Sequence, residues 1–198
     1  MPSLARQERF RQVLKERTGT IHCALEAVYH RHNVSAILRT CDSLGLHNVH
    51  LVEGKFKPSK GPAKGAERWL ALHHHKSAEE AVQALSDQGV ALWVADLDER
   101  AVPPEQVPVD KPLCLWVGAE LTGVSPVARE AAQGVVCLPM RGFSQSLNVS
   151  VAAALLLHTI TERARLTIGE QMLLSKAQQE ELWQQWMERE SRSKPVSS

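Results

Sequence analysis

The segment "FSQSLNVSVAAALLL", residues 143–157, joins a polar entrance to a strongly apolar run. From Val149 onward the run predicts a helix buried on every side, because a helix at the surface keeps a polar face. The entrance carries several hydroxyl and amide side chains: Ser144, Gln145, Ser146, Asn148 and Ser150. One capping side chain is enough to begin a helix. The remaining polar groups therefore mark this entrance as a candidate functional site.

The length and composition are those of a globular protein. A chain of 198 residues with 43% hydrophobic and 23% charged residues suits one compact domain with extensions. No apolar run reaches the roughly 18 residues that a membrane span needs, and the charged start "MPSLARQERFRQVLKERTG" lacks the apolar core of a secretory signal. The four cysteines lie apart in apolar segments, without a CxxC pair. We therefore expect reduced thiols in a cytoplasmic protein without a membrane partner.

The net charge of +1 hides an uneven distribution of basic residues. Residues 1–20 hold five basic groups against two acidic ones, and residues 55–76 hold six against one. Basic segments on a nearly neutral chain indicate a polyanionic partner such as a nucleic acid. The alternative is a solvated basic surface with no partner.

Strand-like and helix-like segments alternate along the chain. Continuous apolar runs predict strands at 21–28, 49–54, 90–97, 113–120 and 135–140. Amphipathic or capped segments predict helices at 5–17, 33–45, 77–89, 125–134, 148–166 and 176–191. In the second of these helices, Asn33 is the expected cap and Gly45 the expected stop. The alternation is typical of an α/β fold, a parallel sheet with helices on both faces.

Three predicted strands end on residues suited to a ligand site. Ligands of open α/β sheets bind outside the carboxyl ends of the strands, which here are residues 95–97, 118–120 and 138–140. The stretch "GAELTG" is a poor dinucleotide loop, because Glu120 replaces the middle glycine of GxGxxG and would repel a pyrophosphate. The sequence has no P-loop and no GxSxG elbow. The run His73, His74 and His75 has no partner at metal-ligand spacing, so we expect an exposed or RNA-facing loop end and no metal site.

Three segments carry a resemblance to a known family: "NVSAILRTCDSLG" (33–45), "LWVGAELTGVS" (115–125) and "CLPMRGFSQSLNVSVAAALLL" (137–157). In this order and spacing they resemble the three motifs of the SPOUT class of RNA methyltransferases. More closely, they look like its TrmH branch, the tRNA guanosine-18 2'-O-methyltransferases. The third segment is the most specific. The resemblance covers residues 20–166 and is loose over 55–109.

The resemblance implies an α/β domain whose C-terminal part forms a deep trefoil knot, a rare feature that periodicity does not predict. It divides the chain into a basic N-terminal helix (1–19), a knotted methyltransferase domain (20–166) and a C-terminal helical extension (167–198). The cofactor would be S-adenosylmethionine, bound in a bent form by the knot loops, and no metal would be needed. The protein would act on tRNA as a homodimer.

The resemblance also assigns roles to individual residues. The catalytic group would be Arg39, which stabilises the developing alkoxide, because a guanidinium is a poor base at neutral pH. The other residues expected at the reaction centre are Asn33, Glu120, Ser146 and Asn148. The residues expected to bind the cofactor are Leu97, Gly118, Leu138, Met140, Ser146 and Leu147. The residues expected to bind RNA are Arg11, Arg17, His32, Arg163 and Arg165. Without the resemblance, all of these are ordinary surface charges, core residues or helix caps.

The sequence leaves three functions open. The first is methylation of guanosine-18 in the D-loop of tRNA, favoured because about twenty residues precede the core, whereas many rRNA-directed relatives carry a separate RNA-binding domain there. The second is the same chemistry on rRNA. The third is a non-catalytic RNA-binding module with the same fold. Within tRNA, a ribose of the anticodon loop is a competing target.

Overall fold

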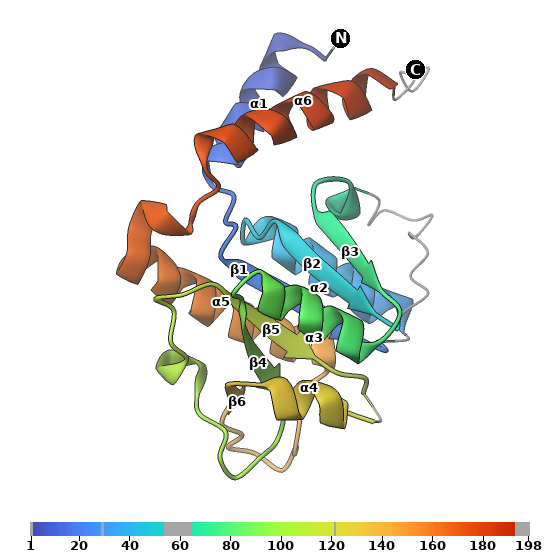
Figure 1. Ribbon diagram of the computed structural model, residues 1–198, viewed down its shortest axis with the longest axis vertical. Helices are drawn as coiled ribbons and strands as arrows, with labels where there is room; N and C mark the ends of the chain where they lie inside the picture. Colours follow the sequence, from blue (N-terminus) through green and yellow to red (C-terminus); the bar gives the residue numbers. More distant parts are fainter. Residues whose placement is uncertain (1, 29, 54–64, 121, 193–198) are drawn as a thin grey trace.

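The computed structural model describes residues 2–28, 30–53, 65–120 and 122–192. Its centre is a six-stranded sheet in the order β3-β2-β1-β5-β4-β6, in which all neighbours run parallel (Figure 1). The strands are β1 (Ile21–Glu26), β2 (Asn48–Val52), β3 (Ala71–His75), β4 (Ala91–Ala95), β5 (Leu113–Val117) and β6 (Gly134–Val136). The predicted α/β class with a parallel sheet is confirmed.

The two central strands are buried along their whole length. Every residue of β1 and of β5 is buried, and the pairing register runs from Ile21 opposite Leu113 to Leu25 opposite Val117. A parallel strand covered on both faces needs apolar side chains at successive positions. This explains why both segments are continuous apolar runs and lack the alternation of a half-exposed strand.

Four helices cover the sheet, two on each face. On one face, α2 (Arg31–Ser43) and α5 (Val149–Ile168) pack Ile37 and Leu157 into the larger apolar core. On the other face, α3 (Ala78–Asp87) and α4 (Pro126–Ala131) pack Leu85 and Ala128 against Trp116. Serine caps open α3 and α4, as expected from the sequence. The predicted cover of helices on both faces is confirmed.

The first and last helices pack against each other, away from the sheet (Figure 1). Helix α1 (Leu4–Lys15) and helix α6 (Lys176–Arg192) bury Phe10, Leu14 and Trp186 in a separate aromatic cluster that includes Trp69. Three short 3-10 helices complete the described part of the chain: η1 (Ala66–Arg68), η2 (Pro104–Gln106) and η3 (Gly169–Met172). Trp186 and its neighbour Trp183 thus take part in packing within one chain.

Strand β3 differs from the prediction, which places residues 73–75 at a loop end. In the structure His73, His74 and His75 belong to β3, which pairs with β2 only and forms one edge of the sheet. An edge strand is partly exposed, so it lacks the continuous apolar run that reveals the other strands. Residues 54–64, which include most of the Lys-rich segment, lie outside the described residues.

Two details of the helices also differ from the predictions. Helix α2 begins at Arg31 with His30 at its N-cap, so Asn33 lies within the first turn and does not cap the helix. Helix α5 is not buried on every side, because Val151 and Leu155 are each 46% exposed. Only one face of α5 packs on the sheet and on α2, and the opposite face of this single chain meets solvent. Gly45 ends α2 with a positive φ of 83°, as expected.

Two further properties concern the whole described chain. All four cysteines are free. Within the described ranges, no helix combines the length and the apolar character needed to cross a membrane.

Candidate active site

A cavity of about 480 Å³ opens at the carboxyl ends of β4, β5 and β6. Its lining contains all six residues expected to bind the cofactor: Leu97, Gly118, Leu138, Met140, Ser146 and Leu147. Two residues expected at the reaction centre, Glu120 and Asn148, line it as well. Parallel strands bring these loops together because their carboxyl ends meet at one edge of the sheet.

Hydrogen bonds join the three sequence motifs beside this cavity. The Asn33 side-chain amide donates to Glu120 Oε1 at 2.5 Å, and the Asn148 side-chain amide donates to Asn33 Oδ1 at 3.2 Å. Residues 87 and 115 positions apart in the chain are thus fixed against each other. We refer to Glu120, Asn33 and Asn148 as the motif triad. Its members lie near the surface, so their remaining polar atoms can meet a ligand.

The polar entrance of α5 divides its side chains between capping and the cavity. Asn148 is the N-cap, and its Oδ1 accepts from the backbone N–H of Ser150 at 2.9 Å. Gln145 and Ser146 line the cavity and are exposed. Asn148 therefore caps the helix, with the Ser150 hydroxyl bonded to it, while Gln145 and Ser146 are available to a bound molecule.

A tight loop after β5 forms one wall of the cavity. The N–H of Gly123 donates to the carbonyl of Ala119 at 2.9 Å, which closes the loop. A Cβ atom on Gly118 would lie 2.1 Å from the Gly123 carbonyl oxygen, so no larger residue fits at Gly118. Gly123 has a φ of 67°, a conformation that glycine adopts without strain. Gly118 is therefore required by close backbone approach, and Gly123 by its backbone conformation.

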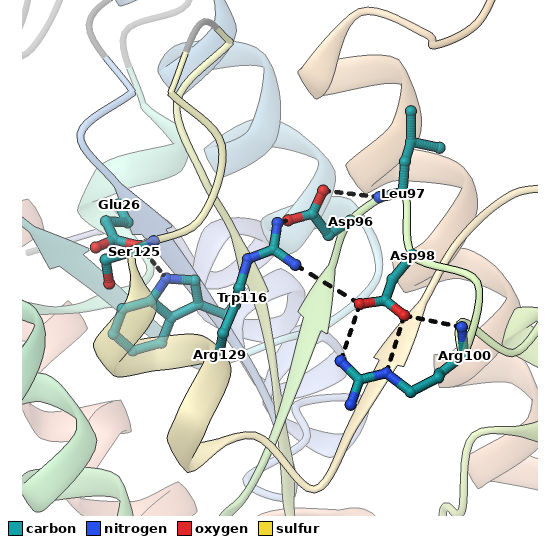
Figure 2. Close-up of polar contacts among 8 residues, drawn as sticks. All are labelled: Glu26, Asp96, Leu97, Asp98, Arg100, Trp116, Ser125 and Arg129. Carbon is teal, nitrogen blue, oxygen red and sulfur yellow. Dashed lines mark hydrogen bonds and ion pairs between the residues drawn. The ribbon is translucent and has the colours of Figure 1, made fainter.

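A buried carboxylate also holds the loop after β5 in place (Figure 2). Glu26, the last residue of β1, accepts from Trp116 Nε1 at 2.8 Å and from the backbone N–H of Ser125 at 3.0 Å. Ser125 in turn caps α4. The sequence analysis misses Glu26. The available signal is an acidic residue inside a buried strand, since a buried carboxylate needs hydrogen-bond donors.

Two aspartates hold the loop that follows β4 (Figure 2). Asp96 accepts from the backbone N–H of Leu97 at 2.7 Å and from the guanidinium of Arg129 on α4. Asp98 accepts from Arg100 Nε at 3.1 Å and lies 3.9 Å from Arg129 Nη1. The hydrogen bonds from Arg100 lower the pKa of Asp98 to about 2. The sequence analysis misses this group as well.

Arg39 does not line the cofactor-sized cavity. It is exposed and lines a second cavity of about 610 Å³, together with His32 and Ser35 of α2 and with Ala154 and His158 of α5. No ion pair or hydrogen bond holds its guanidinium within the described residues. The structure therefore places Glu120, Ser146 and Asn148 at one cavity, bonds Asn33 to two of them, and leaves Arg39 at another cavity.

A family model described as the SpoU rRNA Methylase family matches residues 20–158. The chain belongs to the SpoU methylase family. A relative from Thermus thermophilus, a tRNA (guanosine(18)-2'-O)-methyltransferase, is 38% identical over 83% of this chain and 86% of its own length. The matched range agrees with the extent of the motif resemblance.

Solved structures of SpoU proteins have the same fold. The Aquifex aeolicus TrmH/SpoU tRNA modifying enzyme superposes with a TM-score of 0.86 at 29% identity, covering 96% of this chain and 98% of that one. An AdoMet-bound rRNA methyltransferase from Sinorhizobium meliloti gives a TM-score of 0.66 at 21% identity, covering 78% of this chain and 60% of that one. The second likeness shows the fold alone, because the sequence identity is low.

The basic residues of this SpoU protein that were expected to bind RNA fall into two groups. Arg11 and His32 are exposed, and the Arg11 guanidinium lies 4.6 Å from the centre of the Trp183 ring. Arg163 donates to the carbonyls of Pro104 and Val107 at 2.9 and 2.6 Å. Arg165 pairs with Glu16 at 3.3 Å. The guanidinium groups of Arg163 and Arg165 are therefore already bonded within the chain.

Arg17 is a correction to the predicted RNA-binding set. Its side chain is fully buried, donates to the carbonyl of Leu46 at 2.6 Å and forms an ion pair with Asp42. A buried arginine is retained only when its charge is paired and hydrogen-bonded, as it is here. Arg17 therefore joins the N-terminal segment to α2 and cannot reach an RNA phosphate.

Three histidines on the neighbouring strands β1, β2 and β3 form a second hydrogen-bonded group, which we call the histidine ladder: His22, His50 and His75. His22 Nδ1 lies 3.1 Å from His50 Nε2, and His50 Nδ1 lies 3.0 Å from His75 Nε2. Burial lowers the pKa of His22 to about 4 and that of His50 to about 2. Within the described ranges, no three His, Cys, Asp or Glu side chains are placed to bind a metal ion.

Proposed function

We propose that this SpoU protein transfers a methyl group from S-adenosylmethionine to the ribose 2'-hydroxyl of guanosine-18 in tRNA. The observation that carries the proposal is the motif triad, which joins all three family motifs at the rim of a cavity lined by the six expected cofactor residues. Relatives named for this activity align over most of the chain, which supports the choice of substrate.

The cavity has the size and chemistry that S-adenosylmethionine needs. Its volume of about 480 Å³ is within the usual range for a small-molecule site. Leucine and methionine side chains from the loops after β4 and β6 offer apolar contact, and the carboxylate of Glu120 at the rim suits the positive sulfonium. When bound, the cofactor supplies an activated methyl group. The residues of the chain then need only to align the acceptor oxygen with it and to exclude water.

Arg39 is the residue that we propose for the chemical step. A guanidinium stays charged at neutral pH, so it stabilises the oxyanion that forms as the 2'-hydroxyl loses its proton. This stabilisation grows as the reaction proceeds, and it therefore lowers the barrier. Asn33, Glu120 and Asn148 are proposed to fix the geometry around the acceptor, and Ser146 to bind at the junction of cofactor and substrate.

The same function is proposed to require a homodimer. Helix α5 exposes Val151 and Leu155 beside Leu147, which is 38% exposed, and such an apolar face is covered in most soluble proteins. The Arg39 cavity is lined by Ala154 and His158 of the same helix. A partner that covers this face of α5 would therefore also form a wall of the site that contains Arg39.

The dimer proposal has a direct test in solution. Leu155→Lys places a charge in the proposed interface and should give a monomer by light scattering, with the loss of methyl transfer. Leu4→Lys is the matched control, because Leu4 is exposed on α1 and should leave both properties unchanged. A dimeric Leu155→Lys variant would contradict this interface.

The expected chain organisation is likewise a proposal. We propose a deep trefoil knot in the C-terminal part of residues 20–166, with residues 1–19 and 167–198 as helical extensions. Family membership over residues 20–158 supports the central range. The packing of α1 on α6 supports the treatment of both ends as additions to it. The basic α1, with Arg11 exposed, and the exposed His32 are proposed to contact tRNA phosphates.

The substrate is tested by methylating an unmodified tRNA transcript and mapping the product nucleoside by mass spectrometry. We expect 2'-O-methylguanosine at position 18. Activity on rRNA alone would support the rRNA alternative, and a 2'-O-methyl group at another tRNA position would change the substrate but not the chemistry. Binding of RNA without methyl transfer would support a non-catalytic module.

A further inference from the structure

We infer that Arg129 is a positioning residue that sets the affinity for S-adenosylmethionine by holding the loop after β4 against α4. The inference rests on the proposed function only in that the cavity takes this cofactor. Neither Arg129 nor Asp96 belongs to the residues expected from the family motifs. Their role is inferred from their contacts, which Figure 2 shows.

Asp96 connects the wall of the cavity to a helix. It follows β4 directly, and both Asp96 and Leu97 line the cavity. Its Oδ1 accepts from the Leu97 N–H at 2.7 Å, while its Oδ2 accepts from Arg129. One carboxylate therefore fixes the backbone at the cavity wall on one side and a helix on the other. The side chain of Asp96 is only 17% exposed, so water competes weakly for these bonds.

The loop after β4 carries two carboxylates, and arginines balance their charges. Asp96 and Asp98 bring two carboxylates close together, and Arg129 lies between them, as Figure 2 shows. Arg100 already compensates Asp98 with three hydrogen bonds, so Asp98 does not depend on Arg129. Asp96 has no other side-chain cation among the contacts of the described residues. Without Arg129, Asp96 would keep a charge that is unpaired, mostly buried and close to that of Asp98.

Helix α4 connects two walls of the cavity. Its capping residue Ser125 is bound through its N–H to the buried Glu26, which fixes the loop after β5. One turn later, Arg129 binds the loop after β4. The spacing between the two walls is therefore fixed by a short helix that is itself anchored in the core through Ala128.

The loop also has a reason to need this support. Leu97 is 60% exposed, so apolar packing in the single chain contributes little to holding it. The Asp96 N–H donates to the Val136 carbonyl at 3.2 Å, which fixes the start of the loop but not its side chains. Because ordering a loop on binding costs free energy, a loop that is already held binds its ligand more tightly.

The experiment compares four proteins by calorimetric binding of S-adenosylmethionine without RNA, and by steady-state kinetics with tRNA. Arg129→Ala should raise the Kd and the KM for the cofactor about tenfold, while kcat at saturating cofactor stays within about twofold. Arg129→Lys should recover part of the loss, because an ammonium can pair with Asp96 but cannot bridge both carboxylates. Arg100→Ala is the matched control, an arginine of the same network that does not touch Asp96, and should bind like the wild type.

A double variant separates positioning from direct contact. If Asp96 acts through Arg129, Asp96→Asn with Arg129→Ala should bind no more weakly than Arg129→Ala alone. Unchanged cofactor affinity in Arg129→Ala, with a melting temperature like that of the wild type, would overturn the inference. A loss in Asp96→Asn but not in Arg129→Ala would also overturn it, because Asp96 would then bind the cofactor directly. A wild-type protein that does not bind S-adenosylmethionine would instead refute the proposed function.

Discussion

The motif triad and the histidine ladder are both hydrogen-bonded groups of three side chains, and they differ in their surroundings. In the triad, Glu120, Asn33 and Asn148 lie near the surface beside a cavity, with polar atoms left over. In the ladder, His22 and His50 are 3% and 1% exposed. Polar groups that are buried need every bond that they make. Only the motif triad is therefore available to a ligand.

The hydrogen bonds of the ladder also fix the protonation of its members. His22 Nε2 lies 3.0 Å from the Gly19 carbonyl and donates to it, and because burial keeps His22 neutral, its Nδ1 accepts from His50 Nε2. His50 Nδ1 then accepts from His75 Nε2. This assignment follows from the network, since a carbonyl oxygen can only accept. His22 and His50 are therefore neutral, and an added proton on either would remove an acceptor.

Arg17 and Arg39 differ from each other in the same way. Arg17 is buried and paired with Asp42, whereas Arg39 is exposed and without a partner in the described part of the chain. Both were expected to act on RNA. The structure makes one of them a structural residue and leaves the other free for a substrate.

The largest effect is expected from Arg39→Ala. The loss of one preorganised donor at a developing oxyanion costs about 100- to 1,000-fold in kcat, or about 3–4 kcal/mol. Cofactor affinity should stay within a few-fold, because Arg39 does not line the cofactor-sized cavity. Single-turnover methylation, calorimetry and a melting curve are the measurements. Turnover near that of the wild type would remove the catalytic role.

The matched variant, Arg17→Ala, should act on stability. It removes the partner of Asp42 and the donor to the Leu46 carbonyl, so the free energy of unfolding should fall by about 3 kcal/mol. Urea denaturation measures this change. The folded fraction should keep its affinity for tRNA. A stable variant with weakened tRNA binding would restore Arg17 to the RNA-binding set and break the comparison.

The ladder predicts that stability depends on pH. The pKa of His22 falls from an ordinary 6.5 to about 4 and that of His50 to about 2, because burial disfavours the charged form. Below pH 6.5 the unfolded chain binds more protons than the folded one, so stability is complete above this pH and is lost as the pH falls. Between pH 7.5 and 5.5 the free energy of unfolding should decrease by about 3 kcal/mol.

The control for this prediction is a variant series followed by urea denaturation at each pH. A variant with His22→Gln and His50→Gln should have a flatter profile over this range. His74→Gln, at an exposed position of the same edge strand, should follow the wild type. Equal slopes in all three proteins would show that the ladder does not control acid stability.

The smallest effect is expected from single members of the motif triad. Asn148→Ala should weaken both cofactor binding and turnover, each by about fivefold, which corresponds to about 1 kcal/mol for a hydrogen bond that is not fully buried. Ser144→Ala is the control, because Ser144 lies in the same exposed segment but does not line the cavity. If both variants behaved like the wild type, Asn148 would be a helix cap only.

The sequence predicts the elements whose burial is continuous. The central strands and the capped helices α3 and α4 agree with their patterns, because burial on both faces or a serine cap leaves a local signal. Strand β3 leaves none, because it is an edge strand whose side chains are partly exposed, so it lacks a continuous apolar run. The N-cap of α2 falls on His30, three residues before the expected Asn33, because Asn33 bonds to Glu120 instead.

The candidate site is predicted in part. The residues expected at the cofactor come from motifs, and the sheet brings them to one cavity. Glu26, Asp96 and Arg129 have no motif, since each acts through a partner between 33 and 99 positions away. The distance between the two residues of such a pair depends on how the loops pack together, and no pattern of neighbouring residues predicts this packing.

The sequence by itself determined the chemistry that this protein can offer: the family motifs, the capping serines and the apolar runs of the sheet. These are properties of neighbouring residues, and short-range sterics and hydrophobicity act on them directly. Only the tertiary structure decided which polar side chains are used in folding and which remain free. Arg17 and His50 are enclosed and bonded within the chain, and Arg39 is not, because burial and partners are set by segments far apart in the chain.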